Sequence, residues 1–120
     1  MNFCFEYLKN RNLCTETEYP YTGTDNTCND SKCKGQGWQI TGYVDLAEGD
    51  CEGLENADDN GPVSIAVDAT AMQFYSSGII KRKNLFCGDK PDSLNHGISI
   101  HGETKDYWLA KNSWGSRWGE

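Results

Sequence analysis

Apolar residues recur along the chain with two different periods, and each period predicts one kind of element. Near the N-terminus, Met1, Cys4, Phe5 and Leu8 are spaced as one face of a helix. This spacing predicts an amphipathic helix over residues 1–11. Strict alternation of apolar and polar residues, which is typical of strands, dominates further along the chain.

A second, shorter helix is expected between turn-rich segments. Asp50 can accept hydrogen bonds from the free N–H groups of a helix start, and the helix is expected to run through Asp58. Asn60-Gly61-Pro62 then ends it. Residues 15–23 and 23–37 are rich in turn-forming residues and predict loops.

Several short strands are predicted. Residues alternate over 63–68, after His96 and over 107–111, and residues 39–44 are a further strand candidate. Because side chains alternate between the two faces of a strand, His96 is expected on the same face as Ile98 and Ile100. By the same rule, Asn112 lies on the face of Ala110. Short helices with mostly antiparallel strands predict an α+β fold.

Length, composition and charge restrict the class of protein. The chain has 120 residues, of which 24% are charged and 37% hydrophobic, so we expect one globular domain at most. A net charge of −7 argues against nucleic acid or an anionic membrane as a partner. The sequence contains no apolar run long enough to span a membrane and no signal peptide. We therefore expect any targeting signal to precede Met1 in a longer precursor.

Six cysteines in a chain of this size indicate an oxidising compartment and predict disulfides. The cysteines are Cys4, Cys14, Cys28, Cys33, Cys51 and Cys87. Their spacing does not give the connectivity.

His96 and Asn112 are the candidate catalytic residues. A thiol is a poor nucleophile until a neighbouring imidazole takes up its proton. The imidazole needs a group that fixes its tautomer, and the carbonyl of a neutral Asn can do this. Trp114 and Trp118 are expected to cover the His–Asn hydrogen bond and exclude water from it. The sequence therefore predicts half of a cysteine protease site, without a convincing nucleophile.

Several segments occur together in an order that resembles the papain family of cysteine peptidases, of the cathepsin L-like type. The matching segments are Tyr19-Pro20-Tyr21-Thr22-Gly23, residues 61–69, residues 74–79, Asn95-His96-Gly97 and residues 107–115. The resemblance covers nearly the full chain. It implies a papain-like fold in which residues 1–22 form a helix and crossover from the other half. Residues 23–120 would then form the right-hand, antiparallel β-barrel-like domain, incomplete at both ends.

The same resemblance assigns roles to the candidate residues. His96 would act as general base and acid, and Asn112 would orient it. Met1, Ala66 and Gly97 match positions that wall a substrate pocket, and Asn95 and Trp114 are also expected to contact substrate. Cys28 would pair with a cysteine before Met1 and Cys87 with one after Glu120. The other four cysteines could form two further bridges.

This chain also departs from the family pattern. The Cys-Gly-Ser-Cys-Trp signature that carries the nucleophile is missing, and so is the Gln that helps to form the oxyanion hole. We therefore expect the chain by itself to be inactive, as the C-terminal half of an endopeptidase that uses an acyl-thioester. The alternative is a non-catalytic papain-like binding or scaffold protein. A disulfide-framework domain unrelated to proteases would require the matching segments to be coincidence.

The resemblance further implies peptide or protein substrates, the missing N-terminal half as a partner, and cystatin-like or propeptide inhibitors. It implies no cofactor, and a lysosomal, vacuolar or secreted location. Zinc is not expected, since Cys28 and Cys33 lie far in sequence from both histidines. Cys51 follows a helix cap, but its acidic neighbours would raise rather than lower the thiol pKa, so we favour a disulfide over a nucleophilic role.

Overall fold

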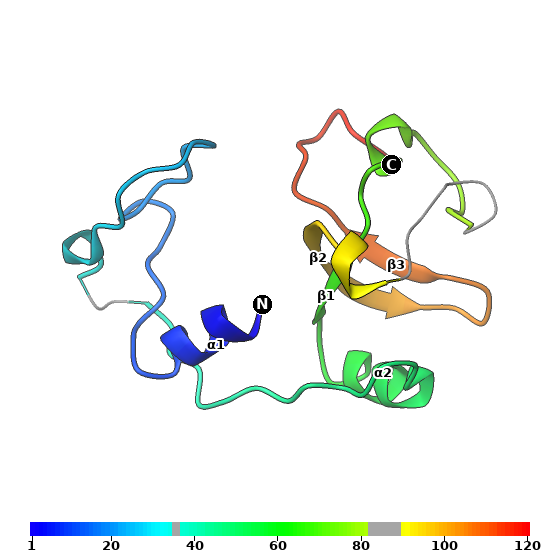
Figure 1. Cartoon of the computed structure of the whole chain (residues 1–120), viewed down its shortest axis with the longest axis horizontal. Helices are drawn as coiled ribbons and strands as arrows, with labels where there is room; N and C mark the ends of the chain where they lie inside the picture. Colours follow the sequence, from blue (N-terminus) through cyan, green and yellow to red (C-terminus); the bar gives the residue numbers. More distant parts are fainter. Residues whose placement is uncertain (35–36, 82–89) are drawn as a thin grey trace. The chain divides into compact units, whose positions relative to one another are not determined.

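The computed structural model describes residues 1–34, 37–81 and 90–120. The chain divides into a first unit, Met1–Asp45, and a second unit, Leu46–Glu120. Figure 1 shows the helix of the first unit and the sheet of the second. The division into 1–22 and 23–120 refers to a complete peptidase domain and stays a prediction.

The first unit holds one α-helix and long loops. Helix α1, Asn2–Leu8, confirms the predicted N-terminal helix with shorter bounds. Its face carries Phe5, whose ring stacks on Tyr43 with centroids 5.4 Å apart. A disulfide between Cys14 and Cys33 closes the loop that contains the short 3-10 helix η1, Asp30–Lys32. The aromatic stack and the disulfide connect segments of this unit that are distant in sequence.

The predicted strand over residues 39–44 is wrong, because this segment is irregular in the structure. A strand needs a neighbour that accepts and donates its backbone hydrogen bonds. Tyr43 instead packs on the helix through Phe5, while Val44 is 86% exposed. The half-buried residues of this segment, Ile40 and Tyr43, are three positions apart, so its burial does not follow the period of a strand.

The second unit combines a helix with a three-stranded antiparallel sheet in the order β1-β2-β3. Helix α2, Cys51–Asp58, begins as predicted, and the Asp50 side chain accepts a hydrogen bond from the Gly53 N–H at 2.8 Å. The strands are β1, Val63–Val67, β2, His96–Glu103, and β3, Trp108–Lys111. Helix α2 contacts β1 and β2 (Figure 1). The predicted α+β class and antiparallel strands are confirmed.

The register of the sheet places His96 among apolar residues. Val67 pairs with His96 and Ile65 with Ile98, so these side chains share one face, as the alternation predicts. Ile100 on the same strand is only 2% exposed and anchors the core. An irregularity between Ile100 and Gly102 shifts the pairing of β2 with β3 by one residue.

Large apolar side chains are also exposed on both units. Phe3 is 92% exposed in the first unit and Phe74 is 85% exposed in the second. None of the helices in the described ranges is long and apolar enough to cross a membrane.

Candidate active site

The sheet brings His96 and Asn112 together. His96 is the first residue of β2, and Asn112 directly follows the last residue of β3. Because Ser99 pairs with Lys111 across these antiparallel strands, the next residue on β3 comes close to the start of β2. Nε2 of His96 lies 2.9 Å from Oδ1 of Asn112, a hydrogen-bond distance, and the pair is partly buried.

The contacts of Asn112 determine the tautomer of His96. The backbone N–H of Ser113 donates to Oδ1 of Asn112 at 2.7 Å, which identifies this atom as the acceptor end of the amide. An acceptor must receive a proton from the imidazole, so Nε2 of His96 carries the hydrogen. The other ring nitrogen, Nδ1, is then the basic one in the neutral imidazole.

Trp114 packs on His96, and Trp118 packs on Trp114 in turn. The exclusion of water from the His–Asn hydrogen bond stays a prediction. The Trp114 ring lies 5.0 Å from the His96 ring, centroid to centroid, at an interplanar angle of 32°. Trp118 meets Trp114 edge to face, with centroids also 5.0 Å apart. Trp114 is itself 38% exposed, so its position depends on the support that Trp118 provides.

Asn95 connects the end of β1 to the start of β2. Its backbone N–H donates to the Val67 carbonyl at 3.1 Å, and its Oδ1 accepts from the Ala69 N–H at 2.9 Å. Its Nδ2 lies 3.2 Å from the hydroxyl of Thr70. These contacts fix the backbone just before His96. A direct contact of Asn95 with substrate stays a prediction.

An open depression of about 510 Å³ lies beside His96. It is lined by Ala69, Thr70, Gln73, Asn95, His96 and Trp114. Ala69, Thr70 and Gln73 come from the segment after β1, and sequence reasoning did not assign them to the site. An extended chain placed in this depression would lie next to the imidazole.

Ala66 and Gly97 lie directly opposite each other in the pairing of β1 with β2, and both are exposed. They are small residues, so their side chains leave space above this face of the two strands. Since neighbours along a strand point to opposite faces, this face is not the one that carries His96. Met1 belongs to the first unit, and its expected place in the same pocket stays a prediction.

Sequence reasoning missed three residues that support the tryptophans. The indole N–H of Trp118 donates to the Met72 carbonyl at 3.0 Å, and the Tyr75 ring packs on Trp118 at 5.3 Å. The Tyr75 hydroxyl lies 3.0 Å from Oε1 of Glu120. Burial and this carboxylate raise the pKa of Tyr75. Tyr75 lies in residues 74–79, a segment that resembles the family, and this resemblance could have pointed to it. The Met72 contact is made by a backbone carbonyl, which no sequence pattern marks.

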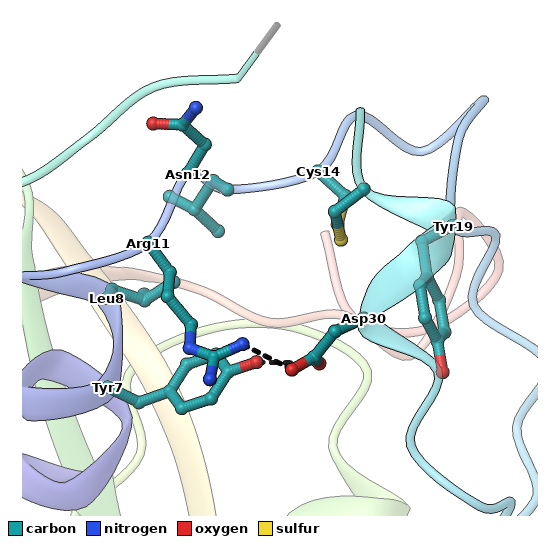
Figure 2. A pocket seen from close by; sticks show the side chains of 9 residues that line it. Tyr7, Leu8, Arg11, Asn12, Cys14, Tyr19 and Asp30 are labelled. Carbon is teal, nitrogen blue, oxygen red and sulfur yellow. Dashed lines mark hydrogen bonds and ion pairs between the residues drawn. A yellow bond between two sulfur atoms is a disulfide. The ribbon is translucent and has the colours of Figure 1, made fainter. Parts of the chain in front are cut away.

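The first unit has a depression of its own, about 410 Å³ in volume, around an acidic side chain (Figure 2). Asp30 forms an ion pair with Arg11 and accepts a hydrogen bond from the Tyr7 hydroxyl at 2.7 Å. The Cys28 thiol donates to the same carboxylate at 3.1 Å. The Cys28 and Tyr7 hydrogen bonds and the Arg11 charge lower the pKa of Asp30. Asp30 therefore favours folding above its unfolded pKa of 3.8, and this contribution is lost as the pH falls.

One of the expected disulfides is present, between Cys14 and Cys33. The second of the two bridges expected within this chain is not formed, because Cys4 and Cys51 are both free and exposed. Cys28 is also free, and its pairing with a cysteine before Met1 stays a prediction. Cys87 lies outside the described residues.

The Asp30 carboxylate makes the Cys28 thiol less reactive. It accepts the thiol hydrogen and opposes the thiolate charge, so it raises the pKa of Cys28 above the ordinary 9.0. We expect Asp30→Asn to lower this pKa and to make Cys28 react several-fold faster with an aromatic disulfide reagent at pH 8, since the thiolate is the nucleophile. Site-resolved mass spectrometry would measure the rates, with Cys4 and Cys51 as internal references. An unchanged Cys28 rate would contradict this role of Asp30.

No group of three His, Cys, Asp or Glu side chains within the described ranges is arranged to hold a metal ion. His101, the second histidine, lies with Nε2 2.7 Å from the Ser99 hydroxyl and is exposed. His101 therefore makes a local contact on β2 and is not paired with Asn112.

Known proteins share both the sequence and the fold of this chain. A "Papain family cysteine protease" family model matches residues 1–120. A "KDEL-tailed cysteine endopeptidase CEP2" of Arabidopsis thaliana is 41% identical over the whole chain, which covers 34% of that protein. A "Cathepsin L-like peptidase" of Aedes aegypti is 42% identical, again over the whole chain and 37% of the relative. The chain thus spans about a third of the length of these relatives.

Solved structures agree with the sequence matches. The cysteine protease CMS1MS2 of Carica candamarcensis, in complex with E-64, superimposes with a TM-score of 0.82 at 30% identity, over 99% of this chain and 54% of that one. Digestive procathepsin L 3 of Tenebrio molitor larval midgut gives 0.79 at 34% identity, over 100% and 40%. The expected papain-like fold is therefore confirmed, and the chain belongs to the papain family of cysteine proteases.

Proposed function

We propose that this chain is the C-terminal portion of a papain-like cysteine endopeptidase and carries the histidine and asparagine of its active site. The nucleophilic cysteine would come from a segment outside this chain. The hydrogen bond of 2.9 Å between His96 and Asn112 carries this proposal, because it directs the basic Nδ1 away from Asn112 and toward an incoming thiol.

The chemistry follows from this tautomer. Nδ1 of His96 takes the thiol proton, and the thiolate sulfur bonds to the carbonyl carbon of the peptide. As the C–N bond breaks, the imidazolium returns this proton to the leaving amine, which leaves an acyl-thioester. Water then attacks the thioester with His96 as base, and the acid and the free thiol are released. Asn112 keeps the ring oriented through both proton transfers.

The arrangement of the pair favours an enzyme over a binding module. His96 and Asn112 lie at a hydrogen-bond distance of 2.9 Å, and Trp114 packs on the imidazole. A binding or scaffold protein does not need this arrangement, whereas a catalytic site needs the carbonyl of this amide next to His96.

We infer peptide or protein substrates from the open depression beside His96, which can hold an extended chain. Ala66 and Gly97, on the face of β1 and β2 that does not carry His96, would leave room for a large apolar side chain such as Leu or Phe. We also propose a lysosomal, vacuolar or secreted location, as for a protease similar to a cathepsin L-like peptidase. Inhibition by a propeptide or by a cystatin-like protein is proposed as well, and one similar solved structure is a procathepsin. The proposed chemistry uses protein side chains and water and needs no cofactor.

The test is peptide hydrolysis by the complete protein, defined here as the product of the full reading frame that contains this chain. We expect it to release a fluorescent amine from a peptide amide with Leu or Phe as the second residue before the cut. A thiol-directed epoxide should block the reaction, and the isolated chain should show no turnover. An inactive complete protein without the nucleophilic cysteine would overturn the proposal in favour of a binding role.

A further inference from the structure

The tryptophan cover of His96 requires support, because Trp114 is partly exposed and follows the end of β3. The segment from Ser113 to Glu120 contains Gly115 and Gly119, both with positive φ values, of 86° and 71°. Glycine allows such turns but also leaves the backbone free to adopt others. Contacts with residues outside this segment must therefore help to hold Trp114 over the imidazole.

Trp118, in the same segment, links Trp114 to such a residue. Its ring edge packs on Trp114 at a centroid distance of 5.0 Å. Its indole N–H is fixed by the Met72 carbonyl at 3.0 Å, in the 3-10 helix η2, Met72–Phe74. Trp118 thus connects Trp114 to the segment after β1.

Tyr75 and Glu120 complete the connection. The Tyr75 ring packs on Trp118 at 5.3 Å, and its hydroxyl lies 2.8 Å from the Gly78 carbonyl and 3.0 Å from Oε1 of Glu120. The same carboxylate oxygen accepts the Gly78 N–H at 3.0 Å. Figure 1 shows the red C-terminal segment returning to the green segment that holds η2. Glu120 therefore fixes the end of the segment from Ser113 to Glu120.

Gly119 allows the backbone to pass close over the Tyr75 ring. A Cβ atom at this position would lie 3.3 Å from Cε1 and 3.4 Å from Cδ1 of Tyr75, and φ at Gly119 is 71°. The close approach and the positive φ together indicate that the ring and the backbone are fitted to each other. The Tyr75 ring is thus held between Trp118 and Gly119.

We propose that Tyr75 and Glu120 are positioning residues of the His96–Asn112 site, which act through Trp118 and Trp114. This inference rests on the proposed function for its effect on catalysis. We call the contacts of Tyr75 and Glu120 with each other and with Trp118 and Gly78 the brace. When the brace is intact, Trp114 stays on the imidazole and keeps water from the His–Asn hydrogen bond. When it is broken, the glycine-containing segment moves and His96 loses its fixed orientation.

The test uses Glu120→Ala, Glu120→Gln and Tyr75→Phe in the complete protein. Glu120→Gln keeps an acceptor oxygen for Tyr75 and Gly78, so it is the conservative control for Glu120→Ala. Glu48→Ala, on an exposed loop of the same unit, is the control for loss of an acidic residue. The first readout is the NMR shift of the His96 ring protons, which the Trp114 ring current displaces. His101 provides a reference in the same spectra.

We expect Glu120→Ala and Tyr75→Phe to move the His96 signals toward those of an uncovered histidine and to lower kcat by about 10-fold. KM should change little, and Glu120→Gln should restore both readouts. Unchanged His96 shifts in both Glu120→Ala and Tyr75→Phe would overturn the brace. If the parent protein hydrolyses no peptide, the proposed function fails, while the NMR shifts still decide whether the brace exists.

Discussion

Replacing His96 by Gln is expected to lower kcat/KM of the complete protein by about 10⁴-fold, because both proton transfers lose their carrier. Asn112→Ala should cost less, about 100-fold, since the imidazole remains but loses the partner at 2.9 Å that orients it. Steady-state hydrolysis of the fluorogenic peptide amide would measure both effects. The decrease should appear mainly in kcat, as neither side chain is expected to dominate substrate binding.

His101→Gln is the matched control for this prediction. His101 is exposed and contacts Ser99, so its replacement should leave kcat/KM within about 2-fold of the parent, as is usual for a surface substitution. Equal losses in the His96 and His101 variants would point to a general effect of removing histidine. Full activity of His96→Gln would contradict the assigned catalytic role.

Removing the Cys14–Cys33 disulfide has the second large expected effect, on stability. The bridge closes a loop with a sequence separation of 19, and a loop of this length implies a loss of about 3 kcal/mol when it is opened. The double variant Cys14→Ser/Cys33→Ser should lose this amount in the first unit. Denaturant-dependent hydrogen exchange would measure it, for example at the Leu13 N–H, which donates to the Trp38 carbonyl at 2.8 Å.

Cys51→Ser separates this effect from the removal of a cysteine as such. Cys51 is free, exposed and part of the second unit, so its replacement should leave exchange in the first unit unchanged. Amides of β2 serve as an internal reference in the double variant. If opening the bridge left the exchange of the Leu13 N–H unchanged, the disulfide would not contribute to the stability of the first unit.

Elements with local signals were predictable from the sequence. Helix α2 was predictable because Asp50 caps its first turn, and β1 because Val63, Ile65 and Val67 recur at every second position. The false strand over 39–44 also contains residues that favour strands, among them Ile40, Tyr43 and Val44. Whether such a segment pairs depends on a neighbour far away in sequence, and the pattern carries no information about that neighbour.

The same distinction applies to the site. His96, Asn112 and the two tryptophans follow from short motifs, and the structure brings all four together. The supporting contacts of Trp118 could not be predicted. One partner is the backbone carbonyl of Met72, and the Tyr75–Glu120 contact joins residues 45 positions apart in sequence. Such contacts depend on the folded chain and not on residue type alone.

The identity of the nucleophile is the central claim, and it can be measured by labelling the complete protein with a thiol-directed epoxide. Peptide mass spectrometry would then locate the adduct. The account predicts one adduct, on a cysteine that precedes Met1, and its loss in the His96→Gln variant. An adduct on one of the six cysteines of this chain, or none at any cysteine, would contradict it.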